Sequence, residues 1–137
     1  MRFRKSLGVL AASVALSVGV VPQAFAAPDH HMYSDDDTFP WEDSGAKVEF
    51  TEYGDIVKVC DVDEDGYAAY LFVYDQYLYG RKIYTVRAAG NGHCTTYRAS
   101  MGGKYNLPEK KLGFLICVGK SEATAAYCDS AYWVNDH

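Results

Sequence analysis

The sequence is poor in histidine and in positive charge, and after its first 26 residues it shows no persuasive helical period. Four of its 137 residues are His, and 13 Lys or Arg stand against 18 Asp or Glu. Only His93 falls within the expected folded part, which leaves little material for acid–base catalysis. A negative surface also repels nucleic-acid phosphates and anionic lipids. We therefore predict a protein that is not an enzyme and that binds neither nucleic acid nor membranes.

The first 26 residues have the three features of a secretory signal peptide. Residues 2–5 carry three positive charges, and residues 7–21 form an uncharged apolar run. Ala24 and Ala26 provide the small side chains that a signal peptidase accepts. The run is shorter than the roughly 20 residues that a membrane-spanning helix needs. We predict cleavage after Ala26 and a secreted product.

Cleavage there would leave a single acidic domain with a leading arm. Residues 27–137 contain 10 Lys or Arg against 18 Asp or Glu, a net charge of −8. Residues 27–46 are acidic, are interrupted by proline and glycine, and fit neither the helical nor the strand period. We expect a flexible arm there, with Trp41 as its contact to the domain. Residues 47–137 are the expected β-domain.

Short apolar runs separated by turn residues fill this β-domain. Val48 and Phe50 alternate with polar neighbours, whereas residues 67–74 (YAAYLFVY) are apolar on both faces, as in a central strand. The expected strands cover residues 47–53, 56–61, 67–74, 82–88, 94–99, 112–118 and 126–133. This pattern predicts an all-β fold, a small antiparallel β-sandwich or barrel of about seven strands.

All four cysteines lie in the expected secreted part, so the domain is expected to be disulfide-stapled. Four cysteines allow three pairings in an oxidising compartment, and none of the spacings is that of a zinc site. Cys117 and Cys128 fall in neighbouring strands joined by a short loop. We predict that they pair, which leaves Cys60 to pair with Cys94.

The segment from Asp61 to Gly66 (DVDEDG) resembles the start of an EF-hand calcium loop, with Asp61, Asp63 and Asp65 at alternate positions. The glutamate expected at position 12 is replaced by Phe72. A weak extracellular calcium site is one interpretation. The other, which we favour, is a hairpin turn with solvated acids. No other cofactor is expected.

Tyrosine is abundant, and all twelve tyrosines lie beyond residue 26. Six fall between residues 67 and 84, where strand propensity and packing account for most of them. The loop 76–81 carries Tyr77 and Tyr79, which a core does not require. Tyrosine is a rigid, amphipathic contact residue, so Tyr77, Tyr79 and Trp41 are the candidate binding residues.

A resemblance to a known family rests on three segments. They are residues 54–69 (GDIVKVCDVDEDGYAA), 117–119 and 128–130, and the last two segments each contain a cysteine. The chain resembles small secreted actinobacterial proteins of unassigned function that have a GDxVxVxD…DG hairpin and late paired cysteines. The resemblance implies that Asp61, Asp65 and Gly66 are hairpin residues.

Four hypotheses for the function follow. We favour a non-catalytic binding module that acts as a monomer on an extracellular protein or polysaccharide. The first alternative is a proteinaceous inhibitor of an extracellular hydrolase. The second is a weak calcium-binding or cell-wall sugar-binding protein, and the third is a hydrolase with paired carboxylates drawn from Glu52, Asp75 and Asp129.

Overall fold

The structure is a computed structural model that describes residues 27–34 and 45–137. The expected signal peptide and Trp41 lie outside the described residues. The described residues form eight strands and three short 3₁₀ turns. Their bounds are β1 (His30–Tyr33), β2 (Ala46–Thr51), β3 (Ile56–Asp61), β4 (Ala68–Asp75), β5 (Lys82–Ala88), β6 (Cys94–Tyr97), η1 (Ala99–Met101), η2 (Gly103–Tyr105), β7 (Lys111–Gly119), η3 (Glu122–Thr124) and β8 (Ala126–Val134).

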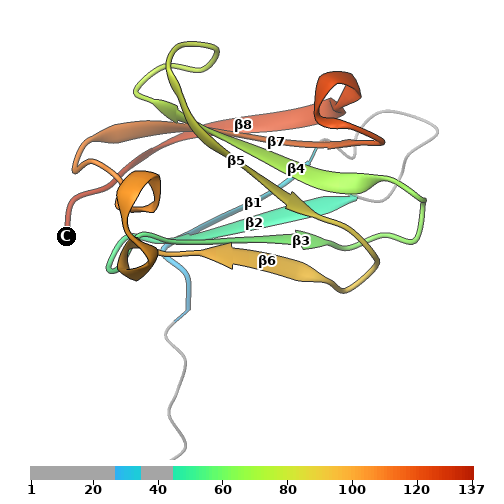
Figure 1. The fold of residues 1–137 in the computed structure, drawn as a ribbon, viewed down its shortest axis with the longest axis horizontal. Coiled ribbons are helices and arrows are strands. Elements are labelled where there is room, and N and C mark those ends of the chain that lie inside the picture. Colours follow the sequence, from blue (N-terminus) through green and yellow to red (C-terminus); the bar gives the residue numbers. More distant parts are fainter. Residues whose placement is uncertain (1–26, 35–44) are drawn as a thin grey trace, which may run out of the picture.

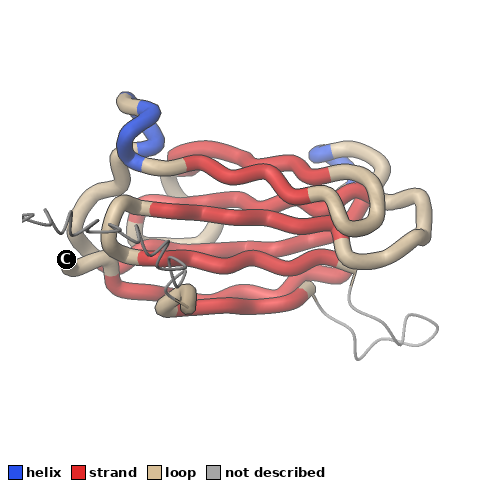
Figure 2. The backbone as a smooth tube through the Cα atoms, turned by 90° about the horizontal axis from the view of Figure 1, so that it is seen from below, coloured by secondary structure: helices blue, strands red, loops and turns tan. Residues whose placement is uncertain are grey.

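The strands form two antiparallel sheets of four, in the orders β1-β2-β3-β6 and β5-β4-β7-β8. Figure 1 shows the two sheets stacked face to face. Figure 2 shows the strands running along the length of the molecule, with the connecting loops gathered at its two ends. The prediction of an all-β, disulfide-stapled fold is confirmed, and the architecture is the sandwich.

The core lies between the sheets and follows the alternation of each strand. Every second side chain of β2 and β3 points inward, as does every second side chain of β4 and β7. The fully buried residues of these four strands include Val48, Phe50, Val57, Val59, Leu71, Val73, Leu112, Phe114 and Ile116. Each such side chain stabilises the fold by roughly 1.5–3 kcal/mol relative to an exposed position.

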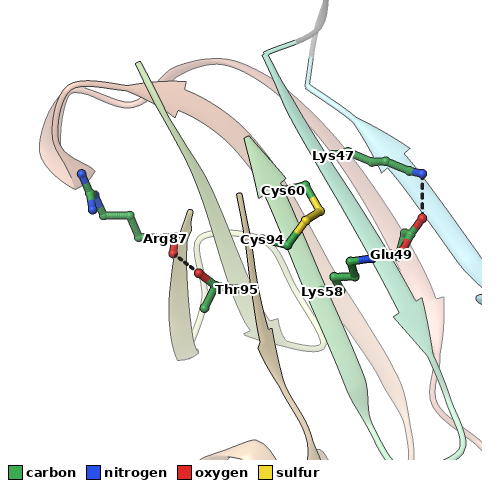
Figure 3. Close-up of a disulfide and its surroundings, with 7 residues drawn as sticks. All are labelled: Lys47, Glu49, Lys58, Cys60, Arg87, Cys94 and Thr95. Carbon is green, nitrogen blue, oxygen red and sulfur yellow. Dashed lines mark hydrogen bonds and ion pairs between the residues drawn. A yellow bond between two sulfur atoms is a disulfide. The ribbon is translucent and has the colours of Figure 1, made fainter. Parts of the chain in front are cut away.

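Contacts between the sheets close both long edges of the sandwich. On one edge, the ring of His30 in β1 stacks on Trp133 in β8, with 5.0 Å between centroids and 11° between planes. On the other, Thr95 Oγ1 in β6 donates a hydrogen bond of 2.7 Å to the carbonyl oxygen of Arg87 in β5 (Figure 3). The two sheets are thus joined on both sides through their outermost strands.

The expected flexible arm is partly wrong, because residues 30–33 form strand β1. This strand pairs with β2 in the register His30↔Phe50 to Tyr33↔Lys47. Met32 is buried at 7% exposure, and the imidazole of His30 packs on an aromatic ring of the core. These tertiary contacts outweigh the weak local preference of a polar four-residue segment.

The acidic turn after β3 is not a hairpin, contrary to the expectation. β3 pairs with β2 and β6, whereas β4 pairs with β5 and β7, so the turn carries the chain from one sheet to the other. The reason is burial. The inward side chains of β3 and β4 cover the two opposite sides of the same core, which places the two strands in different layers.

The predicted disulfides are both confirmed. Cys60–Cys94 joins β3 to β6 with an S–S distance of 2.01 Å, and Cys117–Cys128 joins β7 to β8 with 2.02 Å. In Figure 3, Cys60–Cys94 lies beside Lys47, Glu49 and Lys58.

Candidate functional site

The β4–β5 connection, residues 76–81, is here called the tyrosine loop. Its ends are joined by a hydrogen bond of 2.9 Å from the Asp75 N–H to the Arg81 carbonyl oxygen. Within it, the Tyr77 N–H donates to Asp75 at 2.9 Å and the Gly80 N–H donates to Tyr77 at 3.1 Å. The loop therefore has its own backbone hydrogen bonds, which restrict its conformation.

Leu78 anchors the tyrosine loop to sheet β5-β4-β7-β8. Its side chain lies over Gly113, where a Cβ atom would come within 3.1 Å of Leu78 Cδ2. Its N–H donates to the hydroxyl of Tyr132 at 3.4 Å. With Leu78 held against the sheet, the flanking Tyr77 and Tyr79 remain 63% and 77% exposed.

Two non-glycine residues of this loop have left-handed backbone conformations. The φ angles are 72° at Gln76 and 61° at Tyr79. Such a conformation costs roughly 1–2 kcal/mol per residue for an L-amino acid with a side chain, and strain of this kind tends to gather at functional sites. The loop thus retains a tyrosine at a position where glycine would be less strained.

Charged groups surround the base of the tyrosine loop. The guanidinium of Arg81 lies 3.0 Å from Asp75 Oδ2, and the ammonium of Lys110 pairs with Oδ1 of the same carboxylate. The hydrogen bond from Lys110 and the charges of both cations hold the pKa of Asp75 below its ordinary value. The carboxylate thus remains charged and holds Nη2 of Arg81 at the base of the tyrosine loop.

In the acidic turn, residues 61–66, the carboxylates of Asp61 and Asp65 accept hydrogen bonds from backbone N–H groups. Asp61, which is 2% exposed, accepts hydrogen bonds from the N–H of Gly90 at 2.8 Å and of Asp63 at 3.3 Å. Asp65 accepts one from the N–H of Tyr67 at 2.8 Å. Burial raises the pKa of Asp61, although the two backbone donors oppose the shift.

The three aspartates considered for calcium do not form a group able to hold a metal ion. Within residues 27–34 and 45–137, the structure contains no group of three or more His, Cys, Asp or Glu side chains able to hold a metal ion. A cleft of ≈ 480 Å³ lies beside the acidic turn and is lined by three acids, Asp61, Asp63 and Glu64, and by two cations, Arg87 and Lys120. Opposite charges there largely cancel, so the cleft has no dominant sign.

The histidines are placed differently from one another. His30 stacks on Trp133, and its Nε2 lies 2.8 Å from Glu52 Oε1, so this side chain is part of the packed edge. His93 is exposed in the turn before β6, and its carbonyl oxygen accepts a hydrogen bond from the Asp61 N–H at 2.9 Å. Neighbouring Cys94 is oxidised in a disulfide, so it offers no thiolate to this imidazole.

No known family model matches this sequence, and no curated protein or solved structure is detectably similar to it. In the described part of the chain, no helix is long and apolar enough to cross a membrane.

Proposed function

We propose that the protein is a secreted, non-catalytic binding module that contacts an extracellular polysaccharide through Tyr77 and Tyr79. The observation that carries this proposal is the anchored tyrosine loop. Its two aromatic side chains are 63% and 77% exposed, while Leu78 between them is packed on the sheet.

This arrangement supports binding because the loop loses its conformational entropy when the protein folds rather than when the ligand binds. A ligand that contacts a preorganised surface loses less free energy to the immobilisation of loops and side chains. The phenol ring presents a flat apolar face with a polar hydroxyl at its tip, and such a group suits the mixed surface of a sugar ring.

The oxidised cysteines support secretion. Both disulfides join residues of neighbouring strands in a small domain, and such bonds persist in oxidising compartments rather than in the cytosol. The leader-like residues 1–26 favour the same compartment.

A proteinaceous inhibitor of an extracellular hydrolase is the second candidate function. The specific observation in its favour is the internal hydrogen bonding of the tyrosine loop, since inhibitors present a loop of fixed backbone conformation to the enzyme.

The test is co-sedimentation of the oxidised protein with insoluble cellulose, chitin and peptidoglycan. We expect retention on at least one of these, and its loss in the Tyr77→Ala/Tyr79→Ala double variant. Tyr53→Ala is the matched control, because Tyr53 is 80% exposed in the turn between β2 and β3.

Retention that survives the double variant would exclude the tyrosine loop as the contact surface. Absence of retention, together with lowered activity of a secreted protease or amylase at stoichiometric protein, would replace the proposal with the inhibitor.

A further inference from the structure

A basic groove lies next to the tyrosine loop. It has a volume of ≈ 460 Å³ and lies between the start of β5 and the segment that follows η2. Its lining residues are Arg81, Lys82, Ile83, Lys104, Asn106, Leu107 and Pro108. Three of these are cations and none is acidic. Figure 1 shows the β4–β5 connection and η2 at the same end of the sandwich.

This concentration of positive charge contrasts with the rest of the chain. Residues 27–137 contain 10 cations and 18 acids, yet three of these cations line the groove. A fourth cation, Lys110, pairs with Asp75 nearby. Asp75 and Glu122 pair with members of this group. The lining itself carries three cations and no acid, and each of the acids Asp55, Asp75 and Glu122 contacts a lining residue from outside it. A concave surface concentrates the positive charge of the lining.

The cations of the groove retain capacity for a ligand. The exposed side chain of Lys104 makes no ion pair with any described residue, and its ammonium lies 5.4 Å from the centre of the Tyr105 ring. Arg81 is 78% exposed and reaches Asp75 through Nη2. A guanidinium has five N–H donors, so others remain for a second acceptor.

The apolar wall of the groove is held in place by the core. Leu107 is 3% exposed, and its N–H donates a hydrogen bond of 2.9 Å to the carboxylate of Asp55, which is fully buried. Ile83 and Pro108 extend this wall. The groove thus combines a fixed apolar surface with exposed cations, an arrangement suited to a small anion attached to a less polar body.

We propose that this groove is a binding site for the carboxylate of an acidic sugar within the polysaccharide ligand. The inference rests on the proposed function, because Arg81 belongs to both the tyrosine loop and the groove. Arg81 and Lys104 bind the carboxylate by charge-assisted hydrogen bonds, while the tyrosines contact adjoining sugar rings.

Two observations favour an acidic sugar over other anions. The net charge of −8 over residues 27–137 repels a uniform polyanion, so a ligand with isolated carboxylates is preferred. The groove volume of ≈ 460 Å³ falls within the range of small-molecule sites. A protein partner would instead bury a broad surface of about 800 Å² on each side.

The experiment is titration calorimetry of the oxidised protein with three probes: an oligosaccharide that carries a single glucuronate residue, the uncharged oligosaccharide of equal length, and an oligoglutamate peptide. We expect the glucuronate-bearing oligosaccharide to bind most tightly and its affinity to fall as NaCl is raised. Lys104→Glu should weaken binding about tenfold or more, since it places an anion opposite the carboxylate.

Lys58→Glu is the matched control, because it changes the net charge equally on the outer face of the other sheet (Figure 3). It should leave the affinity within about twofold, since exposed charges separated by more than a Debye length are largely screened. A cooperative thermal unfolding transition in each charge variant would confirm that both are folded.

If the charged and uncharged sugars bind equally and Lys104→Glu does not change the affinity, the groove is not a carboxylate site. The tyrosine loop would then remain the proposed contact surface. Loss of binding in Lys104→Glu but not in Tyr77→Ala/Tyr79→Ala would retain the groove and reject the tyrosine loop. Tighter binding of oligoglutamate would overturn the sugar assignment, and binding of none of the probes would overturn the proposal.

Discussion

Asn135 and Asp55, 80 residues apart in the chain, are hydrogen-bonded to each other inside the protein. The Asn135 Nδ2 donates to Asp55 Oδ1 at 2.9 Å, and both residues are fully buried. The other carboxylate oxygen accepts the N–H of Leu107 at 2.9 Å. This network connects the β2–β3 turn, the segment before β7 and the residue after β8.

Asn135→Ala should lower the free energy of unfolding by about 3 kcal/mol, because it leaves a buried carboxylate oxygen without this donor. Urea denaturation measures the loss. Asn106→Ala, at an exposed position, is the control and should stay within about 0.5 kcal/mol. Similar losses in both variants would contradict a structural role for the Asn135–Asp55 hydrogen bond.

Tyr84→Phe should reduce the loss of stability at alkaline pH. Burial, and then the charge of Asp55, raise the pKa of Tyr84 above its ordinary value of 10.0. Above pH 10 the unfolded chain therefore releases this proton before the folded protein does, and stability falls as the pH rises. Urea denaturation at pH 7 and between about pH 10 and 12 gives the free energy of unfolding at each pH. This free energy should decrease less with pH in Tyr84→Phe than in the unaltered protein.

At neutral pH the same Tyr84→Phe change should cost less than about 1 kcal/mol. The reason is that the buried hydroxyl of Tyr84 has no hydrogen-bond partner among the described residues. Tyr53→Phe, at an exposed site, should leave the alkaline profile unchanged. An unaltered profile in Tyr84→Phe itself would show that another group governs alkaline unfolding.

His30→Ala should destabilise the protein by about 1–2 kcal/mol, since it removes the stack on Trp133 and the contact with Glu52. A change in the Trp133 fluorescence should accompany the loss. The adjacent His31 is exposed, so His31→Ala is a close control with little expected effect. Equal stability of both variants would mean that β1 contributes nothing to this edge.

Removal of the two disulfides should have unequal effects. Cys60–Cys94 spans 34 residues and Cys117–Cys128 spans 11. The chain-entropy model gives roughly 4 kcal/mol for the longer loop and roughly 3 kcal/mol for the shorter. Denaturation of the Cys60→Ala/Cys94→Ala and Cys117→Ala/Cys128→Ala variants tests this order, and a reversed order would show that packing of the buried Cys117 outweighs loop closure.

Asp61→Ala should lower the melting temperature, whereas Asp63→Ala should have little effect. Asp61 accepts hydrogen bonds from Gly90 and Asp63, a loss worth about 1–3 kcal/mol. Among the described residues, the side chain of Asp63 accepts a hydrogen bond only from the N–H of its neighbour Glu64. Addition of calcium or of a chelator should leave the melting temperature of the unaltered protein unchanged, and a rise with calcium would restore the calcium interpretation.

Most strands could be predicted from the sequence, because their period reflects which face is buried. The runs at 56–61 and 82–88 match β3 and β5 residue for residue, and the doubly apolar run at 67–74 is the central strand β4. Strand β1 could not be found in this way. It has one buried apolar residue, Met32, and its other main contact is with Trp133, a hundred residues away.

The candidate site was predictable only in part. A pair of tyrosines in a short loop indicated a contact surface, and Tyr77 and Tyr79 are indeed exposed. The anchor of that loop depends on Gly113 and Tyr132, which no local pattern connects to Leu78. The basic groove likewise joins two segments about twenty residues apart in the sequence.

Each disulfide joins two strands of the same layer, and neither one bridges the layers. Apart from the chain's own connections, the two halves of the sandwich are therefore held together by noncovalent contacts, such as the packing of Phe50 on Phe114 and the hydrogen bond from Thr95 to Arg87. Under a shearing load, each half should stay intact as a unit, and the packed interface between them should be the first part to open.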